Sequence, residues 1–397
     1  MNRNLWLLVA AQGLLFTNNV AFLAVNGLVG LSLAPREWMA TLPIMGYVLG
    51  GALATAPVAW CQQRWGRKAS FQIGLATAVF STLLCAWAVM HQDFWLLVFA
   101  TLLAGFYSAS GQLYRFAAAE LARPEFREKA VSFVLAGGLA GAVLGPNLAS
   151  WTRNLVDAPF AGAHLALAAA ALLGLVVMTF IDFPPEPARS GSGGSGRPLA
   201  VIMRQPVFIA SVCAAALGFG VMSLLMAATP IAMQQHHHDF EATALVLEWH
   251  VIGMFAPGFF TGHLIKRFGV LAILGAGIAL NLACIAVALS GVDLMQFLIS
   301  LFLLGVGWNF LFTAGTTLAL TAYRPEEKDK AQAAINFWTF VAMALSSFFS
   351  GALVTTQGWS LLNVGSLFVV ALTAAVVGWY TVYERAQTRS QPAVPGP

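Results

Sequence analysis

Charged side chains are scarce in this 397-residue chain, at 9%, whereas 59% of its residues are hydrophobic. A typical soluble domain carries about 25% charged residues, so this chain has too few of them to cover its own surface in water. The composition therefore excludes a cytosolic enzyme, a nucleic-acid-binding domain and a disordered scaffold. It predicts a polytopic membrane protein whose surroundings are the lipid bilayer.

Several chemical signatures are also missing. The four cysteines stand apart in apolar stretches without any CxxC spacing, which predicts small buried side chains in place of disulfides or a metal cluster; they are Cys61, Cys85, Cys213 and Cys284. No phosphate-binding Gly-Lys-Ser/Thr run and no hydrolase or redox constellation is present. We therefore expect no enzymatic activity, no ATP drive and no prosthetic group.

Long apolar runs dominate the chain instead. Crossing the hydrocarbon core takes about 20 mostly apolar residues, and runs of this length must be helices because lipid offers the backbone no hydrogen-bond partners. The sequence predicts an all-α membrane protein with twelve transmembrane helices, near 4–33, 38–61, 70–90, 94–119, 130–150, 160–181, 206–231, 242–264, 270–290, 294–321, 331–355 and 359–382.

The basic residues predict the orientation. If the N-terminus is inside, all 20 Lys and Arg residues except Arg36, Arg153 and Arg115 lie on the inner side of the twelve runs. Inner loops of membrane proteins carry an excess of Lys and Arg. We therefore expect both termini to be cytoplasmic.

The middle of the chain predicts a division into two halves. Residues 182–205 are rich in Pro, Gly and Ser, and include the run from Gly191 to Gly196, which could be natural or an engineered splice. We interpret them as a cytoplasmic linker between an N-terminal six-helix bundle, 1–181, and a C-terminal six-helix bundle with a short tail, 206–397.

A short repeat supports this division. Arg64-Trp65-Gly66 follows the second run, and Arg267-Phe268-Gly269 occupies the corresponding place after the eighth. Glycine suits a tight turn, and arginine offers a planar fork to carboxylates and helix ends.

Residues 59–68 resemble the signature loop of the major facilitator superfamily, with Ala59 in place of its leading glycine and Gln63 in place of its acidic residue. The resemblance covers essentially the whole chain. It implies two six-helix bundles that rock about a central site, with gating roles for Arg64, Arg67 and Arg267. Arg115 resembles the superfamily's arginine of the fourth span, where a structural hydrogen bond is an equally good interpretation.

Four soft donors stand at membrane depth. Met222 and Met226, and likewise His250 and Met254, are spaced i, i+4 on one helix face. At 1.5 Å per residue, the first pair lies ~13 and ~7 Å and the second ~12 and ~18 Å from the outer ends of their runs. Thioethers favour Cu(I), although methionine also fills gaps in helix packing. A buried ionisable histidine favours a functional site.

This double motif resembles the CcoA-like copper transporters (the CalT group) within the same superfamily. The resemblance implies a secondary-active importer that carries copper across the bacterial inner membrane for assembly of cbb3-type cytochrome c oxidase, with copper chaperones as partners. Met222, Met226, His250 and Met254 would bind the copper ion, which is the transported substrate.

Three further features bear on the function. His236, His237 and His238 in the outer loop could collect metal or simply be solvated. Glu248 lies about 200° around a helix from His250 and could couple protons or contact a neighbouring span. Asn18, Asn19 and Asn26 of the first run would matter more for another cargo.

Two alternatives to copper import therefore remain. Relatives that lack the double motif include riboflavin-type transporters, so the chain could carry an organic solute such as a flavin or a drug. It could also be a copper-binding assembly partner that transports nothing.

Overall fold

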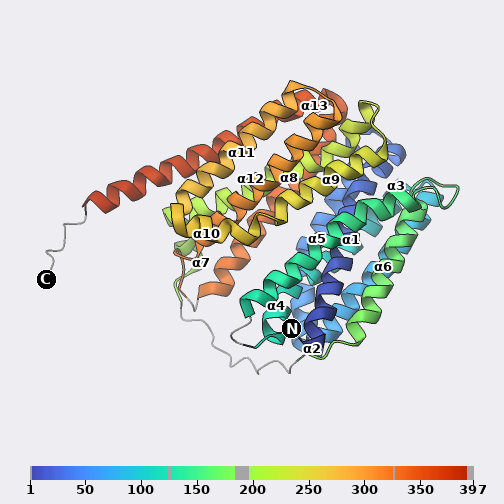
Figure 1. Ribbon diagram of the computed structural model, residues 1–397, viewed down its shortest axis with the longest axis horizontal. Helices are drawn as coiled ribbons and strands as arrows, with labels where there is room; N and C mark the ends of the chain where they lie inside the picture. Colours follow the sequence, from blue (N-terminus) through green and yellow to red (C-terminus); the bar gives the residue numbers. More distant parts are fainter. Residues whose placement is uncertain (1, 124–126, 184–195, 325–326, 391–397) are drawn as a thin grey trace.

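The computed structural model describes residues 2–123, 127–183, 196–324 and 327–390, which are helical nearly throughout (Figure 1). The elements are α1 (Arg3–Leu33), η1 (Glu37–Met39), α2 (Leu42–Met90), α3 (Phe94–Gly111), α4 (Tyr114–Leu121), α5 (Arg127–Thr152), α6 (Ala161–Thr179), α7 (Leu199–Met203), α8 (Pro206–Gln235), α9 (Phe240–Phe255), α10 (Gly258–Phe268), α11 (Val270–Ser290), α12 (Leu294–Ala319) and α13 (Lys328–Ser390).

The helices account for the twelve predicted spans. Within the described residues, nine helices are long and apolar enough to cross a membrane, or ten when α9 and α10 form one bent span. The last of the nine is a 58-residue stretch of α13 that holds the eleventh and twelfth predicted spans, because the chain turns back at Gly358. The fifth predicted span corresponds to α5.

The predicted glycine turns are confirmed. Gly66 interrupts α2 at φ 82° and Gly269 separates α10 from α11 at φ 85°, so both adopt the left-handed region that glycine tolerates best. Each turn lies directly after the aromatic residue of its repeat. The two halves therefore connect their second and third spans in the same way.

Two spans differ from the prediction of a continuous helix. The eighth bends by 42° between α9 and α10, because Pro257 lacks a backbone N–H and cannot continue the helix. The fourth ends at Gly111 and resumes as α4 at Tyr114. The cysteine prediction was correct, since all four side chains are free and at least half-buried.

The outer surface of the helices is apolar. Large hydrophobic side chains project from it, among them Trp6, Leu53, Phe80, Trp95 and Phe368, the last being 78% exposed. In water such a surface would aggregate, whereas lipid solvates it. The chain is therefore a multi-pass membrane protein.

The helices form two bundles that meet along few elements. Helices α1 to α6 pack among themselves, as do α8 to α13. Between the bundles, α5 packs on α9, α1 packs on α8 and α9, and α13 packs on α2 and η1. In Figure 1 the blue-to-green helices form one group and the yellow-to-red helices the other, with α1 and α5 nearest to α8 and α9.

One end of this interface is sealed. We call it the far end, because it holds the connections opposite to the N-terminus, namely 34–41, 91–93, 153–160, 236–239, 291–293 and Gly358. There the Thr41 hydroxyl donates to the Ser347 carbonyl at 2.6 Å and accepts from the Gly351 N–H at 3.0 Å. The Phe240 ring packs on Phe160, with centroids 5.2 Å apart, and on the Arg153 guanidinium.

At the opposite, near end, two short ion pairs of the described residues each lie within one bundle. Arg67 pairs with Glu120 at 2.7 Å in the N-terminal bundle. Arg197 pairs with the fully buried Glu327 at 2.7 Å, and this guanidinium holds the pKa of the carboxyl well below its usual range. Arg197 belongs to the predicted linker, half of which, 184–195, lies outside the described residues. The pair ties the end of that linker to the C-terminal bundle.

We predict that Gly351→Ala will loosen the far-end seal, because the added methyl group would overlap the Thr41 hydroxyl. A Gly27→Cys reporter lies in the same interface, where its Cβ would make only ordinary contacts of 3.6 Å or more. We expect Gly351→Ala to increase the labelling of this cysteine in intact cells by a membrane-impermeant maleimide.

Gly365→Ala is the matched control, since its Cβ on the same helix α13 would meet nothing within 4 Å. Protein without Gly27→Cys gives the background from the native cysteines. Equal labelling with Gly351→Ala and Gly365→Ala would contradict the seal.

Candidate functional site

His250 is held against α12 by the close approach of two helix backbones. Gly305 on α12 has no side chain, so the backbone of α9 can lie directly against it at His250, Gly253 and Met254. The His250 Nδ1 lies 2.6 Å from the Leu301 carbonyl oxygen, which can only accept, so Nδ1 carries the proton. The Nε2 lone pair is fully buried and has no hydrogen-bond partner.

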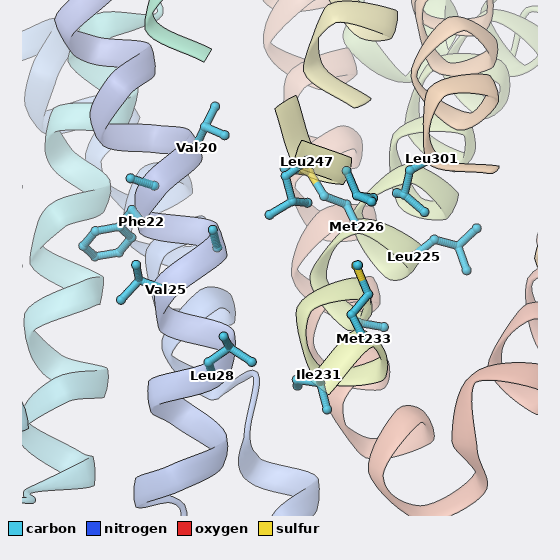
Figure 2. Close-up of a cluster of buried hydrophobic side chains, with 14 of the residues drawn as sticks. Val20, Phe22, Val25, Leu28, Leu225, Met226, Ile231, Met233, Leu247 and Leu301 are labelled. Carbon is cyan, nitrogen blue, oxygen red and sulfur yellow. The ribbon is translucent and has the colours of Figure 1, made fainter. Parts of the chain in front are cut away.

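The three predicted methionine ligands lie in the same apolar cluster. Met222 is 4% exposed, and Met226 and Met254 are each 8% exposed. Figure 2 shows Met226 of α8 near Leu247 of α9 and Leu301 of α12, with α1 across the cluster. Helix α8 packs mainly against α13 and α12, and α9 packs mainly against α12, whereas α8 and α9 pack only lightly on each other. All three methionines belong to one apolar cluster, to which both bundles contribute.

The described residues contain no group of three His, Cys, Asp or Glu side chains that could hold a metal ion. Any copper site here would depend on the methionine sulfurs together with His250. The three consecutive histidines have different surroundings. His236 and His237 are exposed, while His238 Nε2 lies 2.8 Å from the Val292 carbonyl. His238 also lines a cavity of about 630 Å³ between the bundles at the far end.

Glu248 and His250 contact different helices. The Glu248 carboxylate accepts a hydrogen bond of 3.2 Å from the Asn147 amide on α5, whereas His250 faces α12. This bond crosses between the two bundles, part-way between the seal and the middle of the molecule. It places an acidic side chain where a relative movement of the bundles would change its environment.

The asparagines of the first span lie inside the N-terminal bundle. Asn19 accepts a hydrogen bond from the Tyr47 hydroxyl, and Asn18 and Asn19 line a cavity of about 10 Å³ with Tyr47 and Tyr107. Such a volume admits about one water molecule. The Asn26 amide donates to the Phe22 carbonyl at 2.8 Å. Asn18 and Asn19 therefore lie at a cavity too small for an organic solute.

The predicted gating arginines lie at the near end, away from the centre. Arg64 and Arg267 are exposed, and the Arg267 guanidinium lies over the ring of its own neighbour Phe268. Arg67 forms an ion pair with Glu120 on α4. Arg115 is on α4, but its side chain lies outside the part of the chain that the structure describes.

The sequence analysis missed a group of aromatic side chains at the centre, which we call the aromatic group: Phe16 on α1, Phe219 on α8, Phe255 on α9, and Trp308 and Phe312 on α12. Phe16 lies edge-on to Phe255 with centroids 4.9 Å apart, and thus joins the two bundles. Trp308 and Phe312 are stacked at 5.2 Å, and Phe219 packs edge-on against both. Apart from the i, i+4 spacing of Trp308 and Phe312, the sequence offers no local signal for this group.

Trp308 differs from the other members of the aromatic group because it carries a polar atom. Its side chain is 6% exposed and its indole Nε1–H has no acceptor among the described residues, while the four phenylalanines are half-buried. A buried donor without a partner is energetically costly. The aromatic group thus offers ring faces together with the hydrogen-bond donor of Trp308.

Two helical bundles that meet at a sealed end, with a site between them, define a membrane carrier of the alternating-access type. The model of the Major Facilitator Superfamily matches residues 5–256 and again 212–396, so the chain belongs to this superfamily.

Similar proteins agree with this membership. The riboflavin transporter RfnT of Brucella anthropi is 38% identical over 372 residues, which cover 93% of this chain and 94% of that protein. The POT family transporter PepTSo has a TM-score of 0.73 at 12% identity, covering 98% of this chain and 99% of that one. A bacterial homologue of the human lysosomal transporter Spinster, inward-facing and occupied, has a TM-score of 0.70 at 13% identity, covering 99% and 98%. The identities of 12% and 13% to these two solved structures show the fold alone.

The comparison with RfnT bears on the cargo. The resemblance to copper transporters drawn from Met222, Met226, His250 and Met254 rests on two short pairs of residues. The similarity to a riboflavin transporter extends over nearly the whole of both chains. It therefore favours the alternative of an organic solute over copper.

Proposed function

We propose that the chain is a secondary transporter of an organic solute and that a flavin such as riboflavin is the first candidate substrate. The observation that carries this proposal is the 38% identity to a riboflavin transporter over nearly the full length of both proteins. Residues that determine a cargo are spread over several helices of such a carrier, so similarity over the whole chain is stronger support than one short motif.

The arrangement of the bundles fits this role. We assign the near end, where most Lys and Arg residues gather, to the cytoplasm, as the positive-inside rule expects. The far end then faces outward in a bacterial inner membrane, where its seal closes the outer side of the interface. The far-end cavity of about 630 Å³ would receive the solute before the seal opens. The bundles would then rock about the central site.

We predict that the wild-type chain will restore growth on low external riboflavin to bacterial cells that can neither make nor import it. Initial uptake of radiolabelled riboflavin should exceed that of cells with an empty vector several-fold, because the carrier supplies a path that the polar ribityl chain lacks in lipid. Uptake equal to the empty-vector rate, with the protein present in the membrane, would refute the flavin assignment.

Copper remains a second candidate because of one observation. The His250 Nδ1–H donates to a backbone carbonyl, which orients the ring and leaves the buried Nε2 lone pair unpartnered, as metal-binding histidines require. Met222, Met226 and Met254 belong to the apolar cluster that contains Leu301, the hydrogen-bond partner of His250, and would complete a soft donor set for a copper ion. In this case copper chaperones would be the partners on the inner side.

The two cargoes can be separated with Met226→Leu and His250→Gln. If copper is the substrate, each change should lower radioactive copper uptake by about tenfold or more, because each removes a ligand. Met295→Leu, at a side chain that is 65% exposed, is the matched control. If riboflavin is the substrate, wild-type copper uptake should equal the background. Copper bound by the purified protein without uptake would instead support the assembly-partner alternative.

Glu248 is our candidate for the coupling of transport to protons. Its hydrogen bond to Asn147 joins the two bundles, so gain of a proton would alter an interface that must change when they rock. We predict that Glu248→Gln, which keeps the size and an acceptor oxygen, will abolish accumulation of substrate against its gradient but retain exchange across the membrane. The measurement compares uptake with and without an imposed pH gradient.

Glu384→Gln, at an exposed position near the C-terminal end of α13, is the control for this experiment. If the Glu248→Gln protein responds to the pH gradient as strongly as the wild type, Glu248 does not carry the coupling proton.

A further inference from the structure

The aromatic group occupies the same depth in both bundles. Phe16 and Phe219 are each about 20 Å from the starts of α1 and α8, the first spans of their halves, at 1.5 Å per residue. Phe16 belongs to the N-terminal bundle and the other four members to the C-terminal bundle. A molecule bound among them would therefore touch both bundles at the midpoint of the membrane.

The ring geometry leaves aromatic surface available. Trp308 and Phe312 lie nearly parallel, at 10°, and Phe219 meets them at 88° and 82°. Phe255 is tilted by 66° to Trp308, and Phe16 is perpendicular to Phe255. The four phenylalanines are only half-buried although they lie at the centre of the molecule. Their exposed faces can stack on a flat ligand.

Helix packing alone does not explain the burial of the Trp308 N–H. Rings that merely fill space between helices need no polar atom, and an indole N–H in apolar surroundings normally finds an acceptor. Here it is buried and has none. A ligand with an acceptor atom at the edge of its ring would supply the missing hydrogen bond.

We propose that the aromatic group is the subsite for a planar heteroaromatic ring with carbonyl or imine acceptors at its edge. The ring stacks against the phenylalanine faces, and Trp308 Nε1–H donates to one acceptor. This inference rests on the proposed function, because it names the part of an organic solute that the central site recognises. The tricyclic ring of a flavin has this chemistry, whereas a copper ion or a sugar chain has not.

The first test uses the full chain, purified in detergent, and the fluorescence of riboflavin, which falls when its ring stacks on an aromatic side chain. Lumiflavin, which keeps the ring and lacks the ribityl chain, should displace riboflavin. Ribitol, the chain without the ring, should not. Displacement by ribitol and not by lumiflavin would overturn the proposal.

The second test changes the subsite. Trp308→Phe should raise the riboflavin Kd about tenfold, through loss of the hydrogen bond, and Phe312→Leu should do so through loss of stacking. Trp95→Phe, at a ring that is 59% exposed, is the matched control and should leave Kd unchanged. A planar ring without such acceptors, 1-aminoanthracene, should bind wild type and Trp308→Phe equally well, which a general loss of structure would not produce.

The two proposals can fail separately. If wild type transports riboflavin and neither Trp308→Phe nor Phe312→Leu changes its Kd, the subsite is refuted and the proposed function stands. If riboflavin is not transported, 1-aminoanthracene still probes the site: weaker binding to Phe312→Leu than to Trp95→Phe supports the subsite, and equal binding overturns it. Elution of each variant as wild type does on size exclusion shows that it has folded.

Discussion

The hydrogen-bonded contact between Thr41 and α13 is the constraint on which the rest of the arrangement depends. Its hydroxyl uses both the Ser347 carbonyl and the Gly351 N–H, so it holds the two bundles together at the far end. Phe240 reinforces this contact through Phe160 and Arg153 of the other bundle. The Arg67–Glu120 and Arg197–Glu327 ion pairs at the near end each lie within a single bundle, so neither pair opposes separation there. The central side chains therefore lie beneath a closed outer seal.

His250 Nε2 favours copper as the cargo, whereas Trp308 Nε1–H favours an organic solute with an acceptor atom. The surroundings of the two nitrogens differ. His250 Nε2 belongs to a fully buried side chain, so an ion would have to enter a closed part of the molecule. The Trp308 N–H lies among rings that are half-buried and reach both bundles. A site that opens between rocking bundles must keep some surface accessible. The aromatic group meets this condition better than the methionine cluster does.

Periodicity and turn chemistry predicted the fold well, because both are local. The ninth predicted span, 270–290, coincides with α11, and the paired glycines form the same turn in both halves. The chemistry of proline predicts a bend at Pro257, but the eighth span was expected to be one continuous helix. The site was harder to predict, because i, i+4 spacing does not reveal that α12 packs between α8 and α9. Among 29 Phe and 12 Trp residues, nothing local marks the few that meet at the centre.

The contact between Phe16 and Phe255 links recognition to movement. It is an aromatic contact between the bundles at mid-depth, where α1 approaches α9. A ligand shifts a conformational equilibrium only by binding one state more strongly than another. A flat molecule that stacks on rings from both bundles binds best when they are close, and loses contacts when either end opens fully. Stacking at this point would therefore favour the occluded state through which a carrier must pass, whereas a ligand held by one bundle alone would leave that step unassisted.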